Sequence, residues 1–219
     1  MKSVYNVPLI ALALAVCGTA YAVEVNSDTT VPVSADSSTS YEIAAGVTLT
    51  FSVASGETYT LSGAITGAGA VRKEGAGELK LSNSANSFSG GMYNNQGTLR
   101  ATASGAFGTG GITNKGPAKL IFDAKGGVFP NSICMTGSNG IYADPDESTI
   151  QFRQDMTLDG DITSVGSRIA LANRRESSSS PGVAKGPRVV VTGKVTVGSS
   201  NNPAPHLHVI VPYAPSKRS

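Results

Sequence analysis

The chain has 219 residues, of which 15% are charged and 40% hydrophobic, with 26 Gly, 11 Pro and no Trp. So few charges exclude a coiled coil, and glycines without a strict third-residue period exclude collagen. The net charge of +2 is too small for the dense Lys/Arg surface that binds phosphate backbones, so no nucleic-acid partner is expected. A single β-rich domain is the class that this composition favours.

Residues 1–22 have the organisation of a secretory signal peptide. The positive start Met1-Lys2 precedes an apolar run from Val7 to Val16, and Ala20-Tyr21-Ala22 supplies the small residues that a signal peptidase reads. Cleavage is expected between Ala22 and Val23, which predicts a secreted or cell-surface protein outside the cytoplasm. The apolar run is shorter than the roughly 20 residues that span a bilayer, so no transmembrane segment is expected to be retained.

A lipoprotein box is the alternative interpretation of this leader. Leu14-Ala15-Val16-Cys17 could place a lipid on Cys17, although Val16 stands where a small residue is expected. Cleavage before Val23 removes Cys17 and leaves Cys134 as the only cysteine, so no internal disulfide is expected in the exported chain.

Short alternating runs follow the leader. Apolar and polar residues alternate at 47–53, 78–82, 98–101 and 150–153, and this period of two predicts half-buried strands. Stretches rich in Gly and Asn separate the runs, and they predict turns. No apolar pattern at helical spacing follows residue 22, so the sequence predicts an all-β protein.

A faint internal repeat indicates how the strands are arranged. The sequence Thr-Leu-Ser-Gly-Ala-Ile-Thr at 60–66 recurs as Thr-Leu-Asp-Gly-Asp-Ile-Thr at 157–163 and more faintly at 191–196. Repeated strands and Gly turns favour a parallel β-solenoid with coils of about 20 to 25 residues, roughly eight coils in a rod about 40 Å long. A β-sandwich is the alternative for many short strands.

The stretch 65–82 resembles the autotransporter-associated β-strand repeat. It contains a Gly-x-Gly turn at 67–69, Lys73, a second Gly-x-Gly turn at 75–77 and a Leu-x-Leu strand at 79–81. The resemblance covers about 45 residues in register. It continues with Asn-Ser-Phe-Ser-Gly-Gly at 86–91, Gly-Thr-Leu at 97–99, and a turn at 106–110 with Phe107 where Leu is commoner in the family.

This resemblance implies an exported, surface-displayed passenger with a right-handed parallel β-helix and no catalytic residue in the repeat. No series of membrane-barrel strands follows the repeat in this sequence. We therefore expect either a short secreted relative or a truncated portion of a longer autotransporter passenger. The predicted organisation is a signal peptide at 1–22, an N-terminal β cap at 23–46, the repeat region at 47–114, a weaker solenoid continuation at 115–205 with a flexible loop at 173–187, and a C-terminal strand and tail at 206–219.

Acidic residues are densest between 144 and 161. Carboxylates on one face of a β-helix can bind calcium or act as acid and base on a polysaccharide. Their spacing fits no calcium loop, and Asp-Pro-Asp is a good turn, so a solvated turn is the favoured interpretation. The cluster comprises Asp144, Asp146, Glu147, Asp155, Asp159 and Asp161.

The remaining candidates are weaker. His206 and His208 could share one side of a strand and hold zinc or copper, but no third ligand lies near them in sequence. Cys134 has no basic or Cys-x-x-Cys context and is interpreted as a buried or half-buried strand residue. The glycine turns at 67–69 and 75–77 superficially resemble phosphate loops but lead into no helix, so we interpret them as coil corners.

A basic stretch surrounds the serines at 177–180. Arg174, Arg175, Lys185 and Arg188 flank this run, which is interpreted as a solvated loop. From Arg168 onward there are eight basic residues and one acidic residue, whereas 23–60 holds five acidic residues and no basic one. This asymmetry could favour head-to-tail contact between rods.

The sequence thus predicts an exported, non-enzymatic β-solenoid that acts as a structural stem or adhesive element at the bacterial cell surface. No catalytic, cofactor-binding or metal residue is assigned, and no cofactor is expected. Surface glycans, or other rods of the same kind, are the candidate partners. The alternative is a β-helical polysaccharide-degrading enzyme that uses the acidic cluster.

Overall fold

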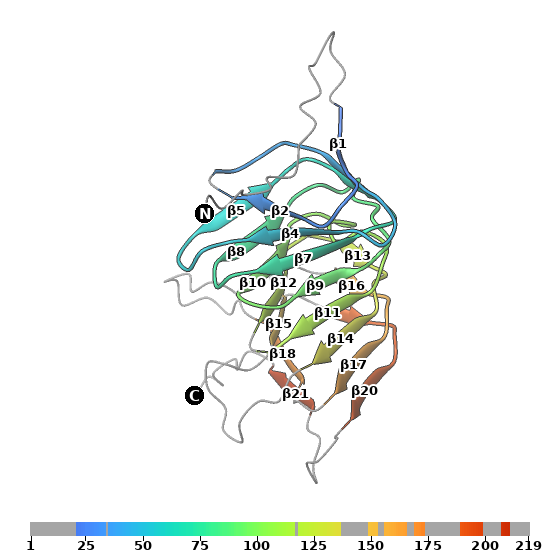
Figure 1. The fold of residues 1–219 in the computed structure, drawn as a ribbon. Helices are drawn as coiled ribbons and strands as arrows, with labels where there is room; N and C mark the ends of the chain where they lie inside the picture. Colours follow the sequence, from blue (N-terminus) through green and yellow to red (C-terminus); the bar gives the residue numbers. More distant parts are fainter. Residues whose placement is uncertain are drawn as a thin grey trace, which may run out of the picture.

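Parallel strands wound into a β-solenoid make up the protein (Figure 1). The computed structural model describes residues 21–33, 35–116, 118–136, 149–152, 156–165, 169–173, 189–198 and 207–210. Within these ranges there are strands, turns and bends but no helix, and every strand pairing is parallel. The prediction of an all-β parallel β-helix is confirmed, and the β-sandwich alternative is wrong because its sheets would be antiparallel.

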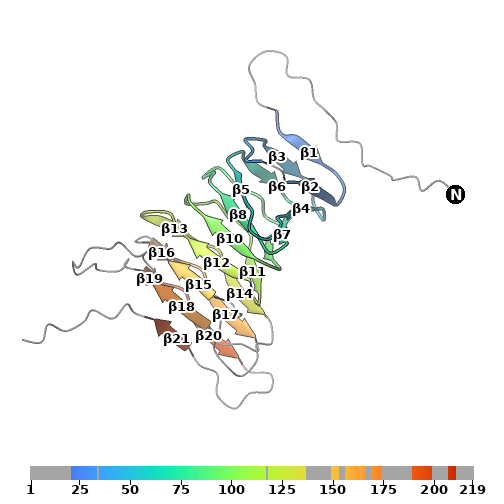
Figure 2. The ribbon, with the colours of Figure 1, turned by 90° about the vertical axis from the view of Figure 1, so that its left-hand side faces the viewer.

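The strands are arranged on three faces of the solenoid. The first face, here called the long sheet, has the order β2-β4-β7-β9-β11-β14-β17-β20. The second sheet has the order β21-β18-β15-β12-β10-β8-β5 and is seen along its length in Figure 2. The third face consists of β1-β3-β6 and β13-β16-β19, joined by an irregular stretch. In this stretch the backbone N–H groups of Ser87 and Ser89 donate to the carbonyls of Ile65 and Gly67 in the preceding coil.

The strands of the three faces have the following bounds. The long sheet contains β2 (Thr29–Pro32), β4 (Thr48–Ser52), β7 (Ala70–Glu74), β9 (Met92–Asn94), β11 (Ile112–Lys115), β14 (Ile133–Thr136), β17 (Ile162–Val165) and β20 (Val195–Gly198). The second sheet contains β5 (Thr58–Leu61), β8 (Glu78–Leu81), β10 (Thr98–Ala101), β12 (Lys119–Phe122), β15 (Thr149–Phe152), β18 (Ile169–Asn173) and β21 (Leu207–Ile210). The third face contains β1 (Val23–Val25), β3 (Tyr41–Ile43), β6 (Ile65–Gly67), β13 (Gly127–Phe129), β16 (Met156–Leu158) and β19 (Val189–Val191).

Coil length changes along the chain. Thr98 pairs with Glu78 on one side and with Lys119 on the other, so the coils of the autotransporter-like repeat are short and nearly equal. Farther along, Ile133 pairs with Ile162 and Ile162 with Val195, so the later coils take up more sequence. The predicted spacing of about 20 to 25 residues is therefore confirmed for the repeat, and the later coils exceed it.

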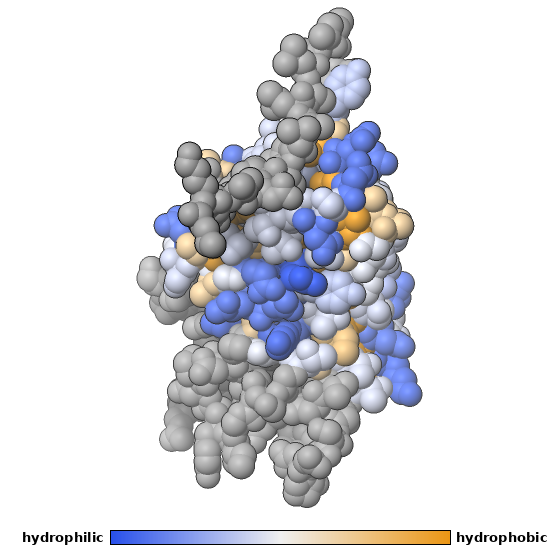
Figure 3. Space-filling model, viewed as in Figure 1, coloured by the Kyte–Doolittle hydropathy of each residue, from blue (hydrophilic) through white to orange (hydrophobic). Residues whose placement is uncertain are grey.

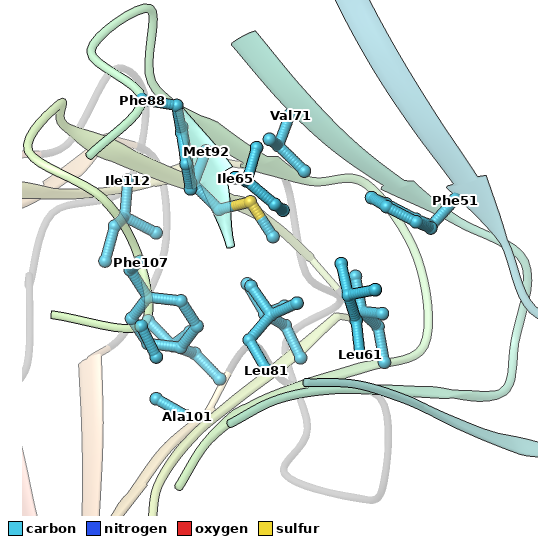
Figure 4. Close-up of a cluster of buried hydrophobic side chains, with 14 of the residues drawn as sticks. Phe51, Leu61, Ile65, Val71, Leu81, Phe88, Met92, Ala101, Phe107 and Ile112 are labelled. Atoms are coloured by element: carbon cyan, nitrogen blue, oxygen red, sulfur yellow. The ribbon is translucent and has the colours of Figure 1, made fainter. Parts of the chain in front are cut away.

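Apolar ladders fill the interior. On the long sheet, one inward row runs in register from coil to coil, and each of its members is at most 2% exposed: Leu49, Val71, Met92, Ile112, Ile133 and Ile162. The second sheet contributes Tyr59, Leu79, Leu99 and Leu120 in the same way. Figure 4 shows part of this packing, with Met92 and Phe107 among the labelled side chains. Because each coil covers its neighbour, burial alone can stabilise a chain without disulfides.

The glycine turns lie at coil corners, as predicted. Gly67 and Gly69 separate β6 from β7, and Gly75 and Gly77 separate β7 from β8. Gly67 and Gly75 have φ angles of 98° and 76°, a region that favours glycine because a Cβ is strained there.

The faint repeat corresponds only partly to the coil geometry. The copies at 157–163 and 191–196 lie one above the other, since Leu158 pairs with Val191 and Ile162 with Val195. The copy at 60–66 instead spans the corner between β5 of the second sheet and β6 of the third face. The copy at 60–66 therefore occupies a different part of the coil from the other two. Their shared Gly is explained by close packing, because a Cβ at Gly63, Gly160 or Gly193 would overlap backbone of the preceding coil.

A buried asparagine links three coils. Asn86 is 6% exposed; its Oδ1 accepts from the Ile65 N–H at 2.8 Å, and its Nδ2 donates to the Ala106 carbonyl at 2.7 Å. Ile65 begins β6, whereas Ala106 lies between strands, so the Asn86 side chain supplies hydrogen bonds where the third face has no continuous ladder. This role accounts for the Asn of the family motif.

Lys73 is fully buried inside the solenoid. Its Nζ donates to the carbonyls of Glu74, Gly75 and Gln96 at 2.8, 2.6 and 3.0 Å. The ammonium group thus links the corner of its own coil to Gln96 of the next coil. Two buried amides, Asn94 and Asn114, continue the same inward row, joined by a 2.6 Å hydrogen bond. Burial lowers the pKa of Lys73 to about 8, while the carboxylate of Glu74 opposes that shift.

The free energy of unfolding is expected to rise with pH above about 8. The unfolded chain keeps the Lys73 proton to a pKa near 10.5, whereas the folded chain releases it at about 8, so the unfolded state binds more protons between these values and stability increases as pH rises through them. The full gain is at most about 3 kcal/mol. Urea denaturation at a series of pH values below about 10 measures it, because burial also raises the pKa of Tyr41, which acts in the opposite direction at higher pH. Lys73→Met is the control, and an equal rise in that variant would contradict the assignment.

Candidate functional site

A shallow groove runs along the corner where the third face meets the long sheet. It has a volume of about 390 Å³ and crosses four coils, those of β9, β11, β14 and β17. Two columns of residues line it. The corner column is Gly91, Gly111, Ser132 and Asp161; the strand column is Tyr93, Thr113, Cys134 and Thr163.

Backbone pairing holds both columns in register. In the corner column, the N–H groups of Met92, Ile112 and Ile133 donate to the carbonyls of Gly111, Ser132 and Asp161 at 2.9, 2.8 and 2.7 Å. In the strand column, each residue is the direct register partner of the next. Neighbouring coils of a parallel sheet lie about 4.8 Å apart, so the groove extends about 14 Å along the solenoid axis.

Side chains become larger and more polar along the corner column. Gly91 and Gly111 present only backbone, whereas Ser132 and Asp161 are exposed and carry a hydroxyl and a carboxylate. The Asp161 Oδ1 accepts from the Lys194 N–H at 2.7 Å, which fixes the carboxylate at the corner. One end of the groove, at Gly91 and Gly111, has no side chain at the corner and is called the ledge. The other end, at Ser132 and Asp161, is polar.

Tyr93 stands beside the ledge. The residue is 37% exposed, and a Cβ built on Gly91 would lie 3.6 Å from the Tyr93 Cε2 atom, so the ring leans toward the glycine. The neighbouring Arg72 pairs with Tyr93 in register but does not line the groove. A large amphipathic ring next to an open ledge is suited to flat contact with a ligand.

The described lining of the groove offers groups that can bind a ligand. Among its described lining residues Asp161 is the one carboxylate, and there is no histidine or lysine. Cys134 is half-buried on β14, as predicted, with no basic side chain among the groove-lining residues to activate it. An aromatic face, hydroxyls and one acceptor carboxylate can hold a ligand.

Several predicted candidates fall elsewhere. Asp144, Asp146, Glu147 and Asp155 lie outside the described residues, as do His206 and the basic stretch 174–188. His208 is on β21. Asp159 and Asp161 are exposed at one corner, and Asp159 accepts a hydrogen bond from Thr192.

The structure also brings together residues that sequence reasoning missed. Tyr93 carries no motif signal, since it occupies one outward position of a short strand. In the sequence, Gly111 is only part of a glycine turn and Asp161 only part of an acidic cluster. The alternation that predicts outward positions identifies the strand residues as exposed, but only coil register places them in one groove.

Likeness to known proteins is consistent with this architecture. The chain is 43% identical over 79 residues to the Adhesin BmaC autotransporter of Brucella suis biovar 1 (strain 1330). The chain is autotransporter passenger-like. The matched stretch is 36% of this passenger-like chain and 2% of that adhesin, so the likeness concerns a small part of a much longer protein. No family model and no solved structure matches the chain.

The part of the chain that the structure describes offers neither a membrane helix nor a metal cluster. It contains no helix of the length and apolarity needed to cross a bilayer. In the same ranges, no three residues among His, Cys, Asp and Glu are grouped so that they could hold a metal ion. In the coloured part of the face seen in Figure 3, hydrophilic residues surround small hydrophobic patches.

Proposed function

We propose that the protein is an exported, non-enzymatic β-solenoid that serves at the bacterial cell surface as a stem with an adhesive face. The observation that carries this proposal is the parallel ladder that runs in register from β2 to β20, in a chain partly similar to an autotransporter adhesin. Such a ladder holds outward side chains at fixed intervals along a rod.

The interior suits a stem. Successive coils are joined by parallel strand pairing on the three faces and, inside, by the Lys73 and Asn86 hydrogen bonds. In a solenoid each coil contacts only its neighbours, so the rod is held together by the sum of many small interfaces between coils. The predicted signal peptide supports export; residues 1–20 lie outside the described residues, and cleavage before Val23 remains a prediction.

Bead adhesion tests the proposal. The exported protein is purified, its N-terminal residue is determined, and beads coated with it are counted on epithelial monolayers against beads coated with an unrelated β-solenoid. Retention severalfold above the control is expected, together with an N-terminus at Val23. Retention equal to the control would contradict the adhesive role.

A substrate screen separates the enzymatic alternative. The same preparation is incubated with pectin, alginate and glycosaminoglycans, and no release of reducing ends is expected. Turnover that falls on Asp144→Ala or Asp146→Ala would replace the proposal with a polysaccharide-degrading enzyme.

A further inference from the structure

The fold requires glycine at Gly111 less strictly than at its neighbours, because the one tight contact of an added Cβ is with the movable Ser132 hydroxyl. The φ of Gly111 lies outside the positive region, and a Cβ there would approach only Ser132, 3.1 Å from the Oγ and 3.6 Å from the carbonyl oxygen. By contrast, a Cβ added at Gly90 or Gly110 would meet backbone of the preceding coil at less than 3.0 Å, so close packing requires glycine at both. Gly111 is exposed and lines the groove; its effect is to keep the ledge beside Tyr93 open.

The two ends of the groove offer complementary chemistry. At the ledge, the partly exposed ring of Tyr93 can cover an apolar C–H face. Two and three coil spacings away, at about 10 and 14 Å, Ser132 and Asp161 offer a hydroxyl and a fixed carboxylate. Thr113 adds a hydroxyl between the two ends, and Thr163 adds another in the same coil as Asp161. Sugars combine these features, because a pyranose ring has apolar C–H faces and a rim of hydroxyls that donate and accept.

We propose that the corner groove binds a neutral oligosaccharide laid along the solenoid axis, with one sugar ring stacked on Tyr93 and sugar hydroxyls bonded to Ser132 and Asp161. The length of the groove requires more than one sugar unit. An acidic glycan is disfavoured because the described lining has one carboxylate and no cation to pair with a uronate. This inference deepens the proposed adhesive function and rests on it for its biological role.

A single shallow groove is expected to bind one oligosaccharide weakly, and the display of many copies on one surface raises the overall affinity. The test therefore uses protein-coated beads on an array of neutral gluco-, manno- and galacto-oligosaccharides beside acidic oligogalacturonates and alginate oligomers. Binding to at least one neutral series, with little to the acidic ones, is expected. A blank array, or a preference for the acidic series, overturns the proposal.

Four variants locate the site. Tyr93→Ala and Gly111→Leu are expected to reduce array binding about tenfold or more, by removing the stacking face and by filling the ledge. Tyr93→Phe retains most binding because it keeps the ring. Thr50→Ala lies on the same outward row of the long sheet, outside the groove, and is the matched control. Unchanged binding in both Tyr93→Ala and Gly111→Leu overturns the assignment.

Cys134 provides a readout that does not depend on adhesion. Its half-buried thiol lies in the groove, so a bound oligosaccharide is expected to slow its alkylation severalfold, and equal rates with and without the binding sugar count against the site. If the beads adhere to cells while the array stays blank, the adhesive function is supported and the groove is rejected as an oligosaccharide site. Oligosaccharide binding in the groove without adhesion to cells would support the groove and contradict the adhesive function.

Discussion

Replacing Gly75 with alanine is expected to lower the free energy of unfolding by about 2 to 5 kcal/mol. Two effects add. The backbone has a φ of 76°, which costs an alanine about 1 to 2 kcal/mol. The new methyl group would also overlap the carbonyl oxygen of Val53 in the preceding coil, and forcing extra volume into a packed contact typically costs about 1 to 3 kcal/mol.

Two neighbouring glycines separate these effects. Gly56 has a φ of 82° and nothing within 4 Å of a Cβ, so Gly56→Ala should show the backbone term alone. Gly77 lacks a positive φ but a Cβ there would overlap the Ala54 carbonyl, so Gly77→Ala should show the contact term alone. Guanidinium denaturation followed by circular dichroism measures all three. Equal losses for Gly75→Ala and Gly56→Ala would show that contact between coils does not limit the corner.

Phe107→Ala is expected to lower the free energy of unfolding by about 3 to 5 kcal/mol. Phe107 is fully buried, and its ring centroid lies 5.5 Å from Phe122 and 6.0 Å from Phe129. Removing it leaves a cavity between the second sheet and the third face. Thermal and guanidinium denaturation measure the loss.

Matched substitutions test that explanation. Phe107→Leu should cost less than Phe107→Ala because it fills part of the cavity. Val128→Ala, at a side chain 49% exposed on β13, should change stability by less than about 0.5 kcal/mol. A loss below about 1 kcal/mol for Phe107→Ala would mean that the aromatic cluster is not tightly packed.

The sequence is most informative where coils are uniform. Alternation in 78–81 identifies Leu79 and Leu81 as inward, and the Gly-x-Gly turns identify two corners, because both depend on local backbone chemistry. Lys73 is visible in the sequence only as one letter of a motif. That it is buried, with three carbonyl partners, follows from stacking of coils that sequence alone does not align.

The candidate site could not be predicted for the same reason. Tyr93 and Asp161 lie far apart in the sequence, and the groove that holds both depends on coils of unequal length between β9 and β17. A constant coil length would place Asp161 at a different corner. The repeat copy at 60–66 shows the same limit, since its similar residues occupy a different corner of the coil from the copies at 157–163 and 191–196.

Because the coils are unequal, the length of the rod depends on the number of coils and not on the number of residues. The short coil from Glu78 to Thr98 and the long one from Ile162 to Val195 each advance the solenoid by one strand spacing, about 4.8 Å. Added residues therefore leave the ladder of Ile112, Ile133, Ile162 and Val195 in step. Residues can be inserted or deleted between strands without changing the length of the solenoid, so the surface loops can vary while the rod length stays constant.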